Sequence, residues 1–246
     1  MKKTLCIDVG GTGIKAALVS PEGELLSERI KISTPYPCPP ERLLDTFKEI
    51  AATFESFDQV TVGFPGLVRN GVVSHVPALS RSTYGGKTDK NLQNQWRGFS
   101  LEIASKEIFS APTLVANDAD VQGAAVVNGH GFEFVMTLGT GVGTALFNDG
   151  HLLPHLELSH ARFRNRESFD IQLGNAARKQ IGNARWSKRV LKAIEAFDSF
   201  LYFDQIHIGG GNAEFLRDME LPKNARIVSN VAGLLGGVRL WNLESK

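Results

Sequence analysis

The pattern of apolar and polar positions near the start of the chain predicts two strands joined by a tight turn. Residues 5–9 are apolar except for Asp8, and residues 14–19 are rich in small and β-branched side chains. Gly10-Gly11-Thr12-Gly13 between them is typical of a hairpin turn. A carboxylate on a buried strand is costly unless it has a function, and glycines let backbone N–H groups approach an anion closely. The pattern therefore indicates a metal–phosphate site.

A second hairpin of the same kind follows about half a chain later. Residues 135–138 and 142–147 are apolar runs that flank Gly139-Thr140-Gly141. One Gly-Thr-Gly turn carries little information, because many hairpins use glycine. Two copies in matched contexts predict two related lobes, each of which offers a phosphate loop to one cleft.

The segment between the two hairpins predicts an α/β lobe. Residues 25–32 alternate like a third antiparallel strand, and residues 41–57 carry apolar side chains at helical spacing. Residues 60–64 form a short buried strand, so the strand–helix–strand order predicts parallel pairing. Residues 80–94 are polar and indicate a loop that faces a substrate. The other elements expected in this half are strands at 71–73 and 113–116 and helices at 100–109 and 121–127.

The second half predicts a further α/β lobe and a closing helix. Its expected elements are helices at 169–179, 186–197 and 232–243 and strands at 205–208 and 227–228. The domain prediction is an N-terminal lobe of residues 1–115, joined by a C-terminal helix within residues 231–246, and a C-terminal lobe of residues 116–230.

Composition and charge narrow the classes of function. The 246 residues are 42% hydrophobic and 22% charged, with a net charge of +1, which is ordinary for a globular protein and favours neither nucleic acid nor membrane partners. The chain shows no signal peptide and no apolar run near ~20 residues, so we expect a cytoplasmic protein. Cys6 and Cys38 lack a Cys-x-x-Cys arrangement, which argues against a zinc site and a disulfide framework.

Two other segments resemble nucleotide-binding motifs. Gly86-Lys87-Thr88 resembles the end of a Walker loop, but Arg81 stands where that motif needs glycine. Gly11-x-Gly13-x-x-Ala16 matches the dinucleotide fingerprint, which requires a helix after Gly13. The residues after Gly13 favour a strand, so a nicotinamide-dependent oxidoreductase is the weaker alternative.

Three further motifs indicate ligand-binding residues. Asn117-Asp118 follows an apolar strand, where open α/β sheets bind ligands, and a carboxylate there can accept a proton from a hydroxyl. Glu157 and His160 lie on a loop and suit hydrogen bonds to a polyhydroxyl ligand, although a solvated loop explains them as well. Gly209-Gly210-Gly211 after a strand indicates close approach to a phosphate chain or nucleotide, or else a tight turn.

The segment 162–192 carries a local excess of positive charge. It contains nine Lys or Arg residues and only two acidic residues, Glu167 and Asp170, which gives a local net charge of +7 in a chain of net charge +1. Such a segment is either a solvated helical face or a track for a polyanion. The nine residues are Arg162, Arg164, Arg166, Arg178, Lys179, Arg185, Lys188, Arg189 and Lys192.

Six motifs in order give the chain a resemblance to the ROK family of sugar kinases over nearly its whole length. They are Asp8-x-Gly-Gly-Thr-Gly, Gly63-Phe-Pro-Gly66, Asn117-Asp118-Ala-Asp120, Leu138-Gly-Thr-Gly141, Glu157-x-x-His160 and Gly209-Gly-Gly211. Within the family the chain is most similar to the polyphosphate glucokinases. The resemblance implies an α/β, actin-like (ribonuclease H-like) two-lobe fold with mixed sheets, and a homodimer.

The resemblance also implies roles for particular residues. Asp118 would be the general base for the sugar 6-hydroxyl, and Asp8 would position Mg²⁺ through water. The sugar would be held by Asn117, Asp118, Glu157, His160 and Gly66. The phosphates of the donor would contact Asp8, Gly10, Gly11, Thr12, Lys15, Gly139, Thr140, Gly141, Gly209, Gly210 and Gly211.

The implied activity is that of a sugar kinase that transfers a phosphoryl group from polyphosphate, ATP or both to the 6-hydroxyl of glucose with Mg²⁺. Ser159 stands where the family usually has glycine, which leaves the identity of the sugar open. The alternatives are a kinase of another hexose that uses ATP only and a non-catalytic sugar-binding regulator on the same fold.

Overall fold

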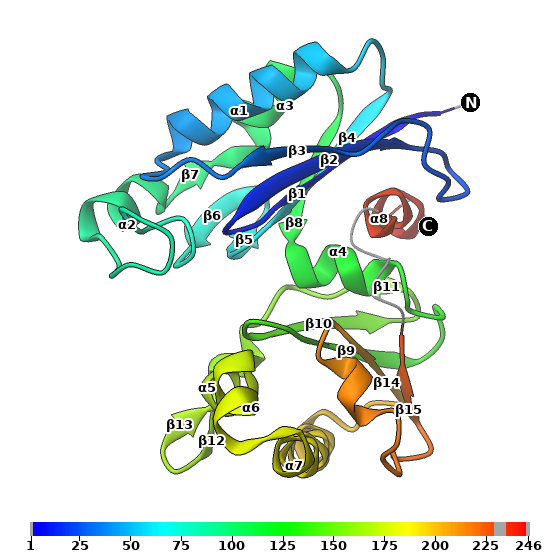
Figure 1. Cartoon of the computed structure of the whole chain (residues 1–246). Coiled ribbons are helices and arrows are strands. Elements are labelled where there is room, and N and C mark those ends of the chain that lie inside the picture. The colour runs from blue at the N-terminus through cyan, green and yellow to red at the C-terminus, as the bar shows by residue number, and fades with distance from the viewer. Residues whose placement is uncertain (1, 229–234, 245–246) are drawn as a thin grey trace. The chain divides into compact units, whose positions relative to one another are not determined.

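The computed structural model describes residues 2–228 and 235–244 and divides the chain into two compact units (Figure 1). Unit 1 comprises Met1–Ala125 with Gly233–Lys246, and unit 2 comprises Val126–Ala232. The expected boundary at residue 116 differs from this division, because the helix that follows the last strand of unit 1 packs on the sheet of unit 1. Of the expected C-terminal segment 231–246, residues 231–234 and 245–246 lie outside the described residues.

Unit 1 is built on a five-stranded mixed sheet with the order β3-β2-β1-β4-β8. The strands β1, β4 and β8 are parallel, whereas β2 is antiparallel to both β1 and β3. Strands β5, β6 and β7 form a separate three-stranded sheet. The strands are β1 (Thr4–Val9), β2 (Gly13–Val19), β3 (Ile30–Ser33), β4 (Gln59–Phe64), β5 (Leu67–Arg69), β6 (Val72–His75), β7 (Phe99–Ser100) and β8 (Thr113–Asn117).

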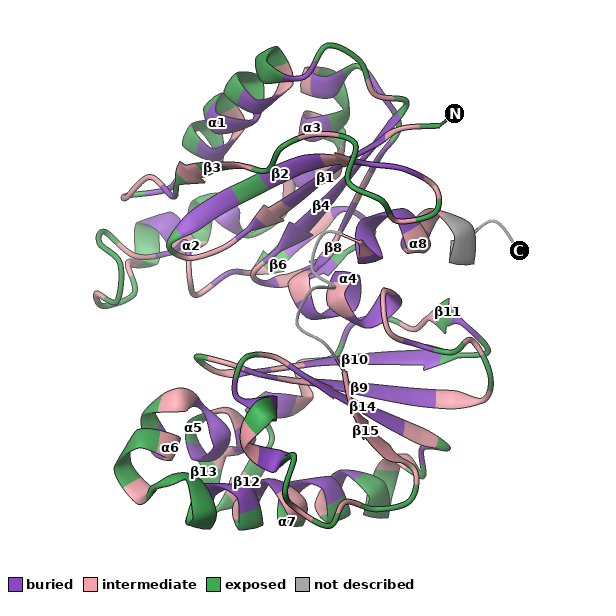
Figure 2. Ribbon diagram, turned by 45° about the vertical axis from the view of Figure 1, so that its right-hand side comes forward, coloured by how far each residue is buried: buried purple, intermediate pink, exposed green. Residues whose placement is uncertain are grey.

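Helices cover both faces of the main sheet in unit 1. The buried side chains of α1, Leu43, Phe47 and Ile50, belong to the same apolar core as Ile7 and Val62 of the sheet. The opposite face contacts α4 and α8, and Figure 2 shows the central strands buried along their length. The helices of unit 1 are α1 (Pro40–Thr53), α2 (Lys90–Trp96), α3 (Leu101–Phe109), α4 (Asp118–Ala124) and α8 (Gly236–Glu244).

Unit 2 has its own five-stranded mixed sheet, with the order β11-β10-β9-β14-β15. As in unit 1, a hairpin is followed across the sheet by two parallel strands, here β14 and β15 beside β9. Trp186, Val190 and Phe197 of α7 pack with Phe134 and Met136 of β9. The elements are β9 (Phe132–Leu138), β10 (Val142–Asn148), β11 (His151–Leu152), β12 (Arg162–Arg164), β13 (Glu167–Ser168), α5 (Phe169–Leu173), α6 (Asn175–Ile181), α7 (Asn183–Leu201), β14 (Gln205–Gly209) and β15 (Ala225–Ile227), with 3₁₀ turns at Leu158–His160 and Ala213–Leu216.

The structure confirms both predicted hairpins and corrects three elements. The third strand is shorter than residues 25–32, and α2 begins inside the predicted loop 80–94. The predicted helix 169–179 is two helices, because Gly174 lies against Thr140, where a Cβ atom would approach the carbonyl oxygen to 2.7 Å. The strand β2 after Gly13 replaces the helix that a dinucleotide fingerprint requires. Among the described residues, no helix is long and apolar enough to cross a membrane.

Candidate active site

The parallel strands of unit 1 end at one edge of the sheet and gather several predicted site residues there. Asp8 of β1 lies opposite Gly63 of β4, and Gly63 lies opposite Ala116 of β8. Asp8, the loop after β4 and Asn117 are therefore neighbours, as expected where parallel strands share a carboxyl edge.

The first glycine turn is held by side chains from the segment that follows β2. The Gly10 N–H donates to the Gly13 carbonyl at 3.1 Å and closes the turn. The Thr34 hydroxyl donates to the Gly10 carbonyl at 2.6 Å, and the Tyr36 hydroxyl lies 2.8 Å from the Gly11 carbonyl. These contacts fix the carbonyl groups of two successive peptides.

Fixing these carbonyls also orients two amides. In a trans peptide the N–H points away from the carbonyl of the same unit, so the N–H groups of Gly11 and Thr12 point away from Thr34 and Tyr36. Within the described residues, neither amide has a hydrogen-bond acceptor in the chain. The turn therefore offers two adjacent donors, an arrangement that binds anions.

Asp8 and Lys15 form a pair beside this turn. They lie directly opposite each other on β1 and β2, with 3.4 Å between the Lys15 Nζ and the Asp8 Oδ2. In the described part of the chain, no group of three or more His, Cys, Asp or Glu side chains is arranged to hold a metal by itself. A single carboxylate suits Mg²⁺, which usually keeps several waters and binds to one or two carboxylates together with substrate phosphates.

Asn117 joins the loop after β4 to the start of α4. Its Nδ2 donates to the Gly66 carbonyl at 3.0 Å, and its Oδ1 caps the helix by accepting from the Ala119 N–H at 2.8 Å. Gly66 has no room for a side chain, since a Cβ atom would lie 2.4 Å from the His75 carbonyl oxygen. The next side chain, Asp118, is half-buried on the first residue of α4 and accepts from the Ala119 N–H at 2.9 Å. Asn117 thus orients the residue that carries the candidate base.

The second glycine turn in unit 2 is tied to the start of α6. The Asn175 N–H donates to the carbonyls of Gly139 and Thr140 at 3.1 Å each. The Asp170 Oδ1 accepts from the Val142 N–H at 2.7 Å on the far side of the turn. Asp170 and Asn175 are not predicted from the sequence, because their contacts depend on how α5 and α6 fold back onto the hairpin.

The third glycine segment lies against the second turn. Gly210 has a φ of +86° and packs so closely that a Cβ atom would lie 2.3 Å from the Leu138 carbonyl oxygen. The Asn212 side chain donates to the Gly139 carbonyl at 3.0 Å. The predicted residues 139–141 and 209–211 are therefore brought together, because β9 and β14 are parallel neighbours that end at the same edge.

Glu157 lies between two histidines on the loop after β11. Its carboxylate oxygens are 3.8 Å from the His155 Nε2 and 3.9 Å from the His160 Nε2. His155 is buried and His160 is half exposed, while Ser159 is only 1% exposed. The serine hydroxyl is thus inside the loop, and Glu157 and His160 are the more accessible groups.

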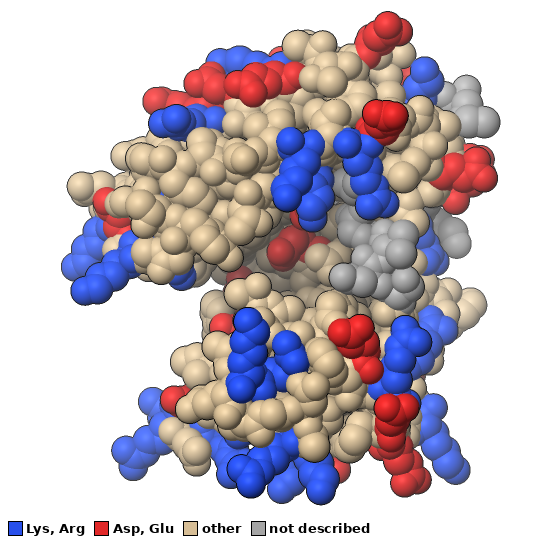
Figure 3. Space-filling view, viewed as in Figure 1, with Lys and Arg blue, Asp and Glu red and all other residues tan. Residues whose placement is uncertain are grey.

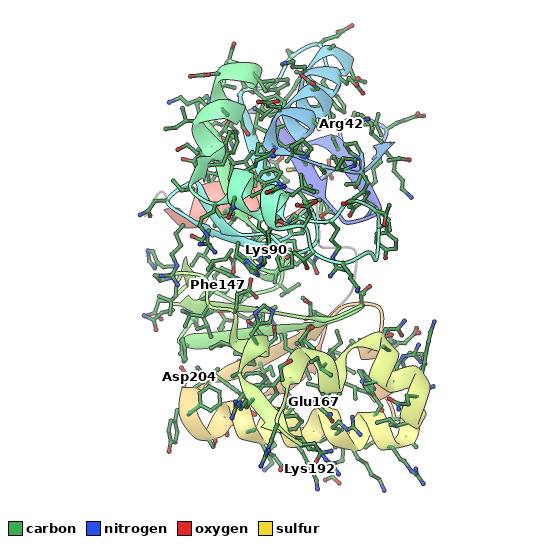
Figure 4. All side chains as sticks on the ribbon, turned by 90° about the vertical axis from the view of Figure 1, so that its left-hand side faces the viewer. Arg42, Lys90, Phe147, Glu167, Lys192 and Asp204 are labelled. Carbon is green, nitrogen blue, oxygen red and sulfur yellow. The ribbon has the colours of Figure 1, made fainter. Side chains whose placement is uncertain are left out.

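The basic segment 162–192 lies mostly on the surface of unit 2. Figure 3 shows Lys and Arg side chains gathered along the α7 side of this unit, and Lys192 projects outward from α7 (Figure 4). Arg178 is an exception, since its guanidinium stacks 4.3 Å from the Phe215 ring centre. Burial, and then the nearby Arg164, lower the pKa of the Arg189 guanidinium. Two cations are therefore close together on this surface.

Each unit thus collects its own share of the predicted site. Unit 1 holds Asp8, Gly10, Gly11, Thr12, Lys15, Gly66, Asn117 and Asp118. Unit 2 holds Gly139, Thr140, Gly141, Glu157, His160, Gly209, Gly210 and Gly211.

Comparison with known proteins shows the family to which the chain belongs. The profile of the ROK family matches residues 4–155. A polyphosphate glucokinase of Mycobacterium leprae is 29% identical over 94% of this chain and 72% of its own, and one of Mycobacterium tuberculosis is 28% identical over 94% and 88%. The structure of an inorganic polyphosphate/ATP-glucomannokinase from Arthrobacter sp. strain KM superposes with a TM-score of 0.79 at 25% identity, covering 100% of this chain and 99% of that one. A Streptomyces griseus ROK glucokinase, solved with glucose and AMPPNP, shares the fold with a TM-score of 0.72 at 18% identity, over 97% and 98% of the chains.

Proposed function

This chain belongs to the ROK family and has its actin-like two-lobe fold, and from that premise we propose that it is a sugar kinase that phosphorylates the 6-hydroxyl of glucose. The observation that carries the proposal is the sheet edge of unit 1, where Asn117 caps the helix that begins at Asp118 and the neighbouring glycine turn holds two amides with no acceptor among the described residues. The names of the relatives, polyphosphate glucokinases among them, support the sugar and the reaction.

Asp118 is the proposed general base. Phosphoryl transfer leaves little covalent work to the protein, so catalysis depends on positioning and on stabilising charge. The carboxylate of Asp118 would accept the proton of the 6-hydroxyl as that oxygen attacks the phosphoryl group. Asn117 has two hydrogen bonds within the chain, so its main contribution would be to hold Asp118 and the Gly66 loop in register, with its remaining N–H directed to the sugar.

Glu157 and His160 are the proposed sugar ligands of unit 2. A carboxylate and an imidazole together offer acceptors and a donor, which suit the hydroxyl groups of a hexose. The buried Ser159 hydroxyl would not reach the sugar, so it does not by itself argue for another hexose.

The glycine segments are the proposed binding sites for the phosphoryl donor. Amides of Gly11 and Thr12 together with Lys15 would bind donor phosphates, and residues 139–141 and 209–211 would do so from unit 2. Asp8 would hold Mg²⁺ through water, and the ion would neutralise charge on the transferring phosphoryl group.

The donor is proposed to be inorganic polyphosphate, ATP or both. Relatives named for polyphosphate support this, as does the basic surface of segment 162–192. A long anion contacts more cations than ATP does, so the rate with polyphosphate should fall more steeply with salt than the rate with ATP. Equal salt dependence would assign segment 162–192 to an ordinary solvated surface. The homodimer and the cytoplasmic location stay predictions of the sequence, and light scattering tests the first.

The test is the formation of sugar phosphate by the wild type and by Asp118→Asn. The variant keeps the shape and the hydrogen-bond acceptor to Ala119, so it should fold and bind glucose while losing turnover. A kinase that acts on another hexose and uses ATP alone would give product only when that hexose and ATP are supplied together. A non-catalytic regulator would bind sugar and give no product with any donor.

A further inference from the structure

Two lysines stand side by side next to the first glycine turn. In the pairing of β2 with β3, Lys15 is directly opposite Lys31, and both are exposed. Side chains of directly opposite residues point to the same face, with Cβ atoms roughly 5 Å apart, and like charges in such a pair are destabilising. The fold therefore holds two cations together at a cost that an anion between them would remove.

Gly13 makes the room that Lys31 occupies. A Cβ atom at Gly13 would lie 2.8 Å from the Lys31 Cε and 3.6 Å from its Cγ. Gly13 does not have a positive φ, so its backbone conformation does not require a glycine. The stem of Lys31 lies across the end of the turn, and its ammonium group is one bond beyond the Cε.

The acidic groups nearby do not balance these cations. Asp8 lies 3.4 Å from Lys15, but Lys31 has no carboxylate partner among the residues that the structure describes. Arg29, the residue before β3, is also exposed. Figure 3 shows Lys and Arg side chains over the β2–β3 region of unit 1. The surface next to the Gly11 and Thr12 amides is thus positive.

We propose that Lys31 is a second donor-binding lysine, which works with Lys15 to hold a linear oligophosphate whose end is bound by the amides of the turn. The inference rests on the proposed function and extends it. It assigns to β3 the binding of the phosphoryl groups that follow the transferred one along the donor chain. The same chemistry describes an inorganic polyphosphate chain and the triphosphate of ATP. Both contain linked phosphoryl groups that carry several negative charges.

The experiment compares Lys31→Met with Lys48→Met. Lys48 is an exposed lysine on α1, paired with Asp45 at 2.7 Å, so both variants lose one positive charge from unit 1. Affinity for inorganic tripolyphosphate is measured by calorimetry without sugar, and KM is measured for polyphosphate, ATP and glucose. We expect Lys31→Met to weaken tripolyphosphate binding and raise the donor KM by about tenfold, the loss typical of one charge-assisted contact. Lys48→Met should change neither, and Lys31→Arg should restore most of the affinity.

Thermal unfolding separates a binding role from a structural one. Lys31→Met removes the repulsion between Lys31 and Lys15. The melting temperature of the variant should therefore equal that of the wild type or rise slightly, although donor binding becomes weaker. Equal donor affinity in the two methionine variants, or a fall in stability that accounts for the weaker binding, would overturn the inference. An increase in KM for polyphosphate alone would assign Lys31 to the inorganic chain, and an increase for both donors to the shared triphosphate.

The outcome also distinguishes this inference from the proposed function. If the wild type phosphorylates no sugar but binds tripolyphosphate through Lys31, the kinase assignment fails and the lysine pair stands as an anion site. If the wild type makes glucose 6-phosphate and Lys31→Met behaves like Lys48→Met, only the lysine inference fails.

Discussion

Removing the carboxylate of Glu133 should destabilise unit 2 more than any exposed acid in the same region. Glu133 is fully buried at the start of β9 and accepts the N–H groups of Asn128, Gly129 and His130 at 2.8, 2.7 and 3.3 Å. Its other contact is the His207 Nε2, 2.6 Å away. One carboxylate therefore accepts from four donors, of which the His207 imidazole is fully buried.

The magnitude follows from the cost of leaving these donors unpaired. Breaking a buried charged network by removing one partner costs about 3–5 kcal/mol, against a total of about 5–15 kcal/mol for a typical domain. Glu133→Ala should therefore lower the free energy of unfolding of unit 2 by about 3–5 kcal/mol. Asp204→Ala is the control, because Asp204 (Figure 4) accepts a single, exposed backbone bond from Phe132, and its loss should cost about 1 kcal/mol.

The same network makes stability depend on pH in a defined direction. Burial raises the pKa of Glu133, but hydrogen bonds from the Asn128 N–H and the His207 imidazole together lower it by more than burial raises it. The pKa of Glu133 therefore lies below its usual range. Burial lowers the pKa of His207 despite the carboxylate, and the Arg226 Nε donates to its Nδ1 at 2.9 Å, which keeps the ring neutral. On acidification the unfolded chain takes up protons at both sites before the folded chain does. Stability should thus fall as pH drops below about 6.5, first through His207 and then through Glu133.

Urea denaturation followed by circular dichroism at pH 7 and pH 5 measures both effects. The wild type should be less stable at pH 5, and His207→Gln should flatten this dependence. A loss below about 1 kcal/mol for Glu133→Ala, or a cost equal to that of Asp204→Ala, would show that the buried carboxylate does not stabilise unit 2 through these contacts.

Three further predictions concern the candidate active site. Asp118→Asn should keep its melting temperature and glucose affinity while kcat falls by about 10²–10⁴-fold, the usual contribution of a general base; turnover near the wild-type value would remove Asp118 from that role. Gly141→Ala should destabilise unit 2 by about 1–3 kcal/mol, because the new Cβ would lie 2.3 Å from the Asp170 Oδ1. A Cβ at Gly139 meets nothing within 4 Å, so Gly139→Ala should melt like the wild type. Equal melting curves for the two variants would contradict this geometry. Tyr36→Phe removes a hydroxyl that holds the first turn and should cost about 1 kcal/mol and raise the donor KM; an unchanged donor KM would show that the turn keeps its shape without it.

Local pattern predicted the elements whose environment is set by neighbours in sequence. Both hairpins follow from apolar runs around glycine turns, and α1 follows from Leu43, Phe47 and Ile50 at helical spacing. The break between α5 and α6 could not be read in this way, because it depends on the contact of Gly174 with Thr140, which are far apart in the chain. The start of α2 depends on Asp89, whose side chain caps the helix; an aspartate before a polar stretch gives only a weak signal.

The residues of the candidate site also fall into those predictable from local sequence pattern and those whose role depends on contacts between distant parts of the chain. Asp8, Asn117 and Asp118 are recognisable because they lie at or just after the carboxyl ends of apolar strands, and the geometry of parallel strands then brings them together. Thr34 and Tyr36, which orient the first turn, carry no motif, since their role arises from hydrogen bonds to carbonyls more than twenty residues earlier. Side chains that support a site through the backbone in this way are found only once the fold is known.

The most direct test of the proposed kinase activity is the formation of glucose 6-phosphate from glucose and Mg²⁺, with ATP and with polyphosphate in parallel. We expect product with at least one of the two donors and its loss in Asp118→Asn. Product with polyphosphate would support the donor proposed for the basic surface, and product with ATP alone would keep the kinase and leave that surface solvated. Absence of product with both donors, while glucose still binds, would contradict the central claim.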